Sequence, residues 1–250
     1  MEDKILKNHI EDQVKKAHKS GIGATKFLTP TEQSEALSYI EHQKYKQKVD
    51  IIKEGGYDGP ERARLIFLNK QWGEYDRLQM VNALVIEYRK QDTIGHRDIL
   101  GALMNMGIER NTIGDIETKS TQPTLVCLPE ISQYILDNLT KIGNIGVAVR
   151  RMPLEELGSR IEELEMMHII ASSMRIDCLV AEIFNISRNE ASNLIQQGKI
   201  SLNHKLVTKQ DDIVEEGNTI ALRGKGKVKI LGIDGKTKKD RIKLVIGRYV

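Results

Sequence analysis

Closely spaced cations give the carboxyl-terminal third of this 250-residue chain its most specific chemistry. In the stretch from Arg223 to Lys229, a cation occupies every second position, and small or apolar residues lie between them. An extended strand would place alternate side chains on one face. We therefore expect Arg223, Lys225, Lys227 and Lys229 to form a row of positive charges. Such a row neutralises phosphates and releases their counterions, so binding would weaken as salt rises.

The net charge of +3 is unevenly distributed along the chain. Residues 174–250 hold 15 Lys and Arg against 9 Asp and Glu, whereas the first 173 residues hold 23 against 26. A separate basic module is typical of nucleic-acid binding. Aromatic residues make up only 4% of the sequence, which disfavours recognition by stacked bases and favours contacts to backbone and shape.

Two short helices are predicted to begin this basic module. Ser187 and Glu190 have the spacing of a capping box, which starts a helix at Arg188 and leaves that arginine at the surface. Residues 175–184 carry a helical apolar stripe of their own, so the two helices should pack together.

A small sheet is predicted to follow the helices. Gly198 ends the second helix, and Lys199 lies where the chain turns into the strand 200–202. Asn203 and His204 tolerate a left-handed backbone, so we expect a tight hairpin turn there. Short apolar runs at 206–207, 213–214 and 219–222 would complete the sheet.

The rest of the chain predicts an α+β protein of three parts. Residues 1–60 read as a helical amino-terminal region, in which Thr29, Pro30 and Glu32 cap a long helix running toward Ile52. Residues 61–152 show the order β-β-α-β-β-α-β, beginning with a strand at Arg64, which is typical of a ferredoxin-like or RRM-like domain. Residues 153–173 read as a linker with some helix and some strand character near residues 166–170, and residues 174–250 form the basic module with a carboxyl-terminal β-hairpin.

Several motifs of the basic module together resemble the S4 RNA-binding domain of the αL type. The motifs are Arg175-Ile-Asp-x-x-Leu, Ser187-Arg-x-x-Ala, Gly198-Lys, Leu202-Asn, Gly217-Asn-x-Ile and Arg223-Gly-Lys-Gly. The resemblance implies a basic surface that grips structured RNA. The candidate RNA-binding residues are Arg175, Ser187, Arg188, Lys199, Asn203, Lys205, Arg223, Lys225 and Lys227. His204 stands where that family commonly has glycine, which leaves the exact geometry of its turn open.

Nearly the whole chain resembles the bacterial YlmH family of S4-domain proteins. The resemblance rests on Phe27-Leu-Thr-Pro, on residues 62–69 and above all on the segment from His96 to Ile116. It implies a cytoplasmic RNA-binding factor whose partner is ribosomal RNA or tRNA on the large ribosomal subunit. It also implies a role in the rescue of obstructed subunits that carry peptidyl-tRNA.

Other classes of function find little support in the sequence. No run of apolar residues is long enough to span a membrane, and the amino terminus lacks the apolar core of a secretory signal. Neither the two cysteines nor the six histidines have metal-binding spacing, and we expect no cofactor and a monomer. His96-Arg97-Asp98 resembles part of a kinase catalytic loop, but the other kinase motifs are missing, so we expect Asp98 to stabilise the start of a helix. Asp115 could pair with Arg97 or Arg110, and a catalytic carboxylate at Asp115 is an open alternative. No catalytic constellation emerges, and the alternative to pure binding is an RNA-modifying enzyme of the pseudouridine synthase or methyltransferase kind.

Overall fold

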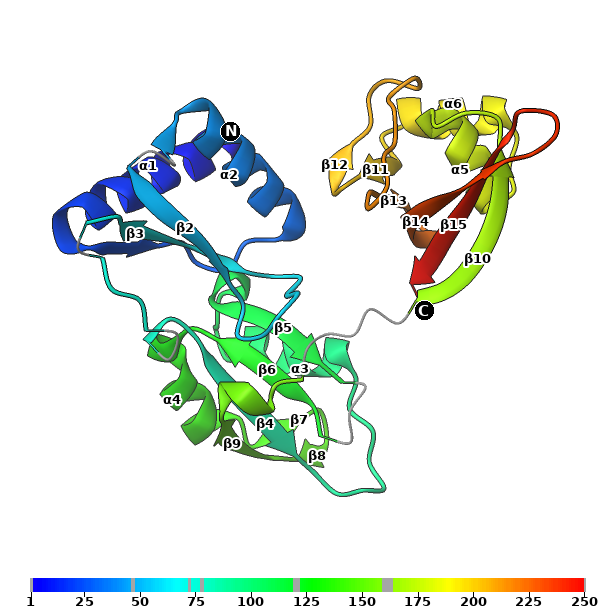
Figure 1. Cartoon of the computed structure of the whole chain (residues 1–250). Coiled ribbons are helices and arrows are strands. Elements are labelled where there is room, and N and C mark those ends of the chain that lie inside the picture. The colour runs from blue at the N-terminus through cyan, green and yellow to red at the C-terminus, as the bar shows by residue number, and fades with distance from the viewer. Residues whose placement is uncertain are drawn as a thin grey trace. The chain divides into compact units, whose positions relative to one another are not determined.

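The computed structural model describes residues 2–45, 48–71, 73–76, 79–118, 122–158 and 164–249. Its contacts divide the chain into unit 1, residues 1–160, and unit 2, residues 161–250 (Figure 1). Unit 1 contains an amino-terminal lobe and a middle lobe, and each unit has helices packed against antiparallel sheet. The α+β class predicted from the sequence is therefore confirmed.

The amino-terminal lobe packs two helices against a three-stranded sheet. Its elements are α1 (Glu2–Ser20), β1 (Ile22–Ala24), α2 (Pro30–His42), β2 (Val49–Glu54) and β3 (Arg64–Asn69), with strand order β1-β3-β2. Thr29 accepts a hydrogen bond from the Glu32 amide and the Glu32 carboxylate accepts one from the Thr29 amide, as the capping box predicted. Helix α1 lies so close to the sheet that a Cβ on Gly23 would be 2.1 Å from the Gln13 carbonyl oxygen.

Two sequence-based assignments in this region were wrong. The helix that begins at Pro30 ends at His42, and the apolar residues that follow form β2 instead of continuing the helix. The strand at Arg64 belongs to this lobe, because β3 pairs with both β1 and β2. Short apolar runs carry no information about their strand partners, so the sequence placed this strand in the wrong sheet.

The middle lobe has the predicted ferredoxin-like topology. Its main elements are β4 (Asn82–Glu87), α3 (His96–Asn105), β5 (Ile113–Glu117), β6 (Thr124–Cys127), α4 (Pro129–Asn138) and β9 (Ala148–Met152). A 3₁₀ turn (Arg110–Thr112) precedes β5, a small hairpin of β7 (Lys141–Ile142) and β8 (Ile145–Gly146) precedes β9, and a second 3₁₀ turn (Leu154–Glu156) follows it. The antiparallel order β5-β6-β4-β9 is that of two split βαβ units, and α3 and α4 share one core with the sheet.

An apolar cluster joins the two lobes of unit 1. Phe27, from the loop before α2, packs with Val81, Ala83 and Val126 of the middle lobe, and its amide donates to the Asn111 carbonyl oxygen at 2.8 Å. A Cβ on Gly114 would meet the Phe27 ring at 2.8 Å. The two lobes are therefore closely fitted to each other.

Unit 2 packs two helices on one face of a six-stranded antiparallel sheet. Its elements are β10 (Leu164–Ala171), α5 (Ile176–Phe184), α6 (Arg188–Gln196), β11 (Ile200–Leu202), β12 (Lys205–Leu206), β13 (Thr219–Leu222), β14 (Gly226–Lys236) and β15 (Ile242–Tyr249). The strand order is β10-β15-β14-β13-β11-β12. One core contains Leu179 and Val180 of α5, Ile195 of α6 and the inward side chains of the sheet.

The predicted linker contains the first strand of this sheet. Its residues 164–171 pair with β15 over all eight positions, and its residues 159–163 lie outside the described part of the chain. The expected boundaries at residues 60 and 173 remain predictions.

Candidate nucleic-acid interface

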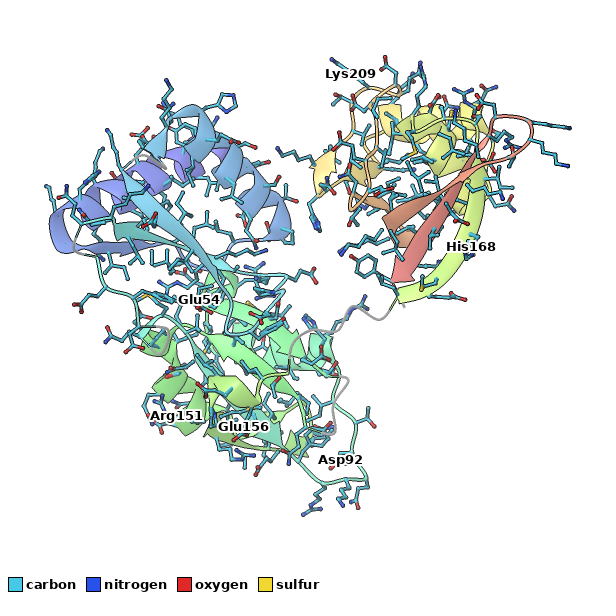
Figure 2. The ribbon with its side chains drawn as sticks, in the orientation of Figure 1. Glu54, Asp92, Arg151, Glu156, His168 and Lys209 are labelled. Atoms are coloured by element: carbon cyan, nitrogen blue, oxygen red, sulfur yellow. The ribbon has the colours of Figure 1, made fainter. Side chains whose placement is uncertain are left out.

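Backbone hydrogen bonds hold the start of α5 against the loop between β12 and β13. Arg175 is the N-cap residue of α5 and forms an isolated bridge with Ile213. The Ile176 amide donates to Asp212 O at 2.9 Å, and the Val214 amide donates to Met174 O at 2.9 Å. Figure 2 shows the side chains of both units, with Lys209 labelled at the exposed part of this loop. The loop therefore fixes the position from which the Arg175 side chain extends.

One buried carboxylate binds the two arginines at the starts of α5 and α6. Asp177 accepts from Arg175 through Nε at 3.1 Å and Nη2 at 3.2 Å, and from Arg188 Nη2 at 2.8 Å. Its own side chain is 5% exposed, whereas those of Arg175 and Arg188 are 37% and 56% exposed. Ser187 caps α6 by accepting from the Glu190 amide at 3.1 Å, so it also fixes the starting point of Arg188.

The electrostatics of this cluster favour a fixed positive surface. Burial alone would raise the pKa of Asp177, but hydrogen bonds from Arg175 and Arg188, the charge of Arg188 and a hydrogen bond from the Cys178 side chain outweigh it and lower the pKa to about 2. Two guanidinium charges against one carboxylate leave a net positive charge. Each arginine is held by hydrogen bonds on one side and exposed on another, which suits the planar recognition of phosphate.

A second basic group lies at the turn between β13 and β14. The Arg223 amide donates to the Lys199 carbonyl oxygen at 3.0 Å, which places these two exposed residues side by side. Lys225 lies in the same turn, between Gly224 and Gly226, whose φ angles are +87° and +110°. The predicted row of four cations on one strand face was therefore wrong for Arg223 and Lys225, because glycine at positive φ favours a turn over a continued strand.

The remaining candidate RNA-binding residues lie in a hairpin turn or on strands of the sheet. Asn203 and His204 both have positive φ, as a two-residue hairpin turn requires, so the histidine leaves the predicted turn intact. The Asn203 Oδ1 atom accepts from the Thr219 amide at 2.8 Å, which ties this turn to β13. Lys205 is exposed on the edge strand β12, and Lys227 on β14 lies with its Nζ 4.2 Å from the centre of the Tyr249 ring.

The residues considered for catalysis have structural roles. Asp98 accepts from the Gly95 amide at 2.9 Å and so caps α3, as expected. Asp115 binds neither Arg97 nor Arg110 among the described residues; it accepts from the Tyr57 hydroxyl and from the amides of Glu61 and Arg62. Within the described ranges there is no cluster of potential metal ligands and no helix that could cross a membrane.

Sequence reasoning missed two features that the structure reveals. The first is the role of Asp177, although an acid in the otherwise apolar segment Ile176–Val180 was a readable signal of a buried ion pair. The second is a pocket in unit 1 that contains Arg62 and Arg110. These arginines are 48 positions apart, so no local spacing could have joined them.

Comparisons with known proteins match both domains. The family model described as "Putative RNA-binding domain in YlmH" matches residues 78–156, which contain the middle lobe from β4 to the second 3₁₀ turn, and the S4 domain model matches residues 174–220. The "Ribosome-associated protein quality control protein P2" of Bacillus subtilis is 31% identical over 228 residues, covering 90% of this chain and 86% of that relative. The solved structure "Cell division protein ylmH from Streptococcus pneumoniae" has a TM-score of 0.52 and 23% identity, over 63% of this chain and 94% of that chain, which shows a shared fold.

Proposed function

Because the chain belongs to the YlmH family of S4-domain RNA-binding proteins, we propose that it binds structured ribosomal RNA or tRNA on the large ribosomal subunit. We place it in the cytoplasm and assign it a non-catalytic role in the rescue of stalled subunits that carry peptidyl-tRNA. The name of the Bacillus relative, which refers to ribosome-associated quality control, supports this assignment.

The observation that carries the proposal is the pair of arginines on Asp177. Their side chains are ordered before any ligand arrives, so less side-chain entropy is lost when phosphates bind. Lys199, Arg223 and Lys225 supply further cations at the turn of the same unit. These clustered cations support a binding role, and the non-catalytic assignment is part of the proposal.

Replacing Arg188 tests the proposed RNA surface. Arg188→Ala should weaken binding of the full chain to tRNA and ribosomal RNA by about tenfold, because it removes one charge-assisted phosphate contact. The slope of log affinity against log salt should fall by about 0.7 to 0.9. Filter binding at several salt concentrations measures both quantities.

Arg241→Ala is the matched control for this experiment. Arg241 is also an exposed arginine of unit 2, paired with Glu182 at 2.9 Å, but it lies outside the candidate surface. The proposal requires Arg188→Ala to abolish co-sedimentation with purified large subunits at moderate salt while Arg241→Ala retains it. Equal behaviour of the two variants would remove Arg188 from the interface, and a modified nucleoside in RNA incubated with the protein would contradict the non-catalytic role.

A further inference from the structure

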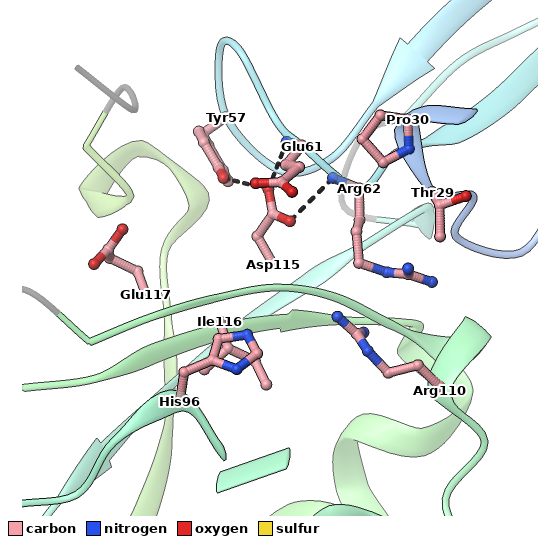
Figure 3. A pocket seen from close by; sticks show the side chains of 10 residues that line it. All are labelled: Thr29, Pro30, Tyr57, Glu61, Arg62, His96, Arg110, Asp115, Ile116 and Glu117. Carbon is pink, nitrogen blue, oxygen red and sulfur yellow. Dashed lines mark hydrogen bonds between the residues drawn. The ribbon is translucent and has the colours of Figure 1, made fainter. Parts of the chain in front are cut away.

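A pocket of about 320 Å³ lies in unit 1, lined by residues of both the amino-terminal and the middle lobe (Figure 3). Arg62 enters it from the segment before β3, and Arg110 enters it from the 3₁₀ turn before β5. His96, at the start of α3, contributes an imidazole. The lobes that line it are in close contact elsewhere, at Phe27 and Gly114.

The two guanidinium groups converge on one backbone oxygen. Ile113 O accepts from Arg62 Nε at 3.2 Å and from Arg110 Nη1 at 2.7 Å. These two side chains also donate to other carbonyl oxygens, Arg62 to Phe27 O at 3.3 Å and Arg110 to Gly114 O at 3.1 Å. Among the described residues, no carboxylate forms a hydrogen bond or ion pair with either guanidinium group. Each fork therefore keeps N–H groups for a ligand.

Three carboxylates, those of Glu61, Asp115 and Glu117, also line the pocket, and among the described residues their hydrogen bonds go to other groups than the two guanidinium groups. Both oxygens of Asp115 are already occupied by the Tyr57 hydroxyl and the amides of Glu61 and Arg62. Glu61 and Glu117 are both exposed. Burial and the neighbouring charge of Arg62 lower the pKa of Arg110 to about 10, although Asp115 and Glu61 raise it. Arg110 therefore stays cationic at neutral pH.

We propose that this pocket binds a phosphate group between Arg62 and Arg110. Two planar guanidinium forks fit the several oxygens of a phosphate better than a single carboxylate. The volume is within the range of small-molecule sites and leaves room for the sugar of a nucleotide beside its phosphate. The choice of phosphate over other oxyanions rests on the proposed RNA-binding function. The phosphate belongs either to bound RNA or to a free nucleotide.

The first experiment tests a free phosphate or nucleotide with the full chain. At constant ionic strength, inorganic phosphate or AMP should raise the unfolding temperature of unit 1, because a ligand that binds only the folded state stabilises it. Arg110→Gln should abolish this shift. Arg97→Gln is the matched control, since Arg97 is an exposed arginine of the same lobe that does not line the pocket.

The second experiment tests an RNA phosphate. Arg110→Gln should weaken tRNA or ribosomal RNA binding by about threefold to tenfold and lower its salt slope by about 0.7 to 0.9. In the wild-type chain, bound RNA or AMP should also protect Arg62 and Arg110 from phenylglyoxal, as read by mass spectrometry. This measurement needs no variant, so it decides the question even if Arg110→Gln folds poorly.

The outcomes distinguish an RNA phosphate from a free nucleotide, and they distinguish failure of the pocket proposal from failure of the proposed RNA-binding function. Loss of the AMP shift in Arg110→Gln assigns the site to a free nucleotide, and loss only of RNA affinity assigns it to RNA. If neither effect nor protection is seen, the pocket proposal is overturned while the Arg188 result stands. An Arg110-dependent AMP shift in a chain that fails to bind RNA would retain the pocket and overturn the proposed function.

Discussion

At the scale of single residues, Asp177 explains why two exposed arginines have defined positions. The sequence identified Arg175 and Arg188 as candidates from their motif, and both lie where that motif predicted, at the starts of helices. It did not identify the acid between them, because the role of Asp177 depends on α5 and α6 packing so that their first turns meet. Local spacing determines helix starts, whereas tertiary packing determines which side chains share a partner.

Asp177→Asn should destabilise unit 2 in a pH-dependent way. The pKa of Asp177 is about 2 in the folded chain and about 3.8 in the unfolded one, so its ionised form adds stability above pH 4. This contribution is about 2 kcal/mol and is lost as the pH falls from about 4 toward 2. Amide hydrogen exchange in α5 and α6 should therefore show a large difference between variant and wild type at pH 6 that narrows on acidification. A difference independent of pH would contradict this account of the ion pairs.

Asp177→Asn also tests whether Asp177 helps RNA binding by holding the two arginines in place or weakens it through its negative charge. Asp177→Asn removes a negative charge, which by itself would strengthen RNA binding, but it also releases both arginines. We expect affinity to fall several-fold in filter binding at fixed salt. Asp211→Asn, which removes an exposed negative charge close enough to influence Arg175, should leave affinity unchanged or raise it. Equal increases in both variants would show that Asp177 only screens the arginines.

At the scale of elements, most helices and strands are of the predicted type, but several pair with other strands or end at other residues than predicted. The ferredoxin-like order of the middle lobe was readable from the alternation of strands and helices, and so were the caps at Thr29 and Ser187. The assignment of β3 to a sheet was not readable, since strand pairing is set by distant contacts. The spacing of the cations suggested one continuous strand. This prediction was wrong because Gly224 and Gly226, both at positive φ, form a turn there.

Asn203→Ala tests whether a predicted RNA contact is instead a turn residue. Asn203 has a φ of 48°, and its side chain accepts from the Thr219 amide. Alanine tolerates that backbone poorly and offers no acceptor, so we expect unit 2 to lose about 1 to 2 kcal/mol of stability. Thermal unfolding and salt-dependent filter binding together decide the role. If Asn203→Ala left stability unchanged but lowered the slope of log affinity against log salt, Asn203 would be an RNA contact and not only a turn residue.

At the scale of the whole molecule, β10 extends the sheet of unit 2 beyond the matched S4 segment. Residues 164–171 precede that segment, which begins at residue 174, yet β10 pairs with β15 along its whole length. Met167 lies opposite Ile246 and Ile169 opposite Leu244, and both β15 residues belong to the core of unit 2. Removing β10 would expose this side of the core and leave an unpaired edge, which favours aggregation.

A fragment of residues 161–250 should therefore fold, whereas one of residues 174–250 should be much less stable. We expect the shorter fragment to unfold at a temperature lower by about 10 °C or more, since several kcal/mol of pairing and burial are lost. Both fragments keep all nine candidate RNA-binding residues. Weak RNA binding by the shorter fragment would thus reflect loss of the sheet that positions those residues, and adding back residues 161–173 should restore binding. Equal thermal stability of the two fragments would show that the S4 core stands without β10, and the boundary at residue 173 would then be the correct one.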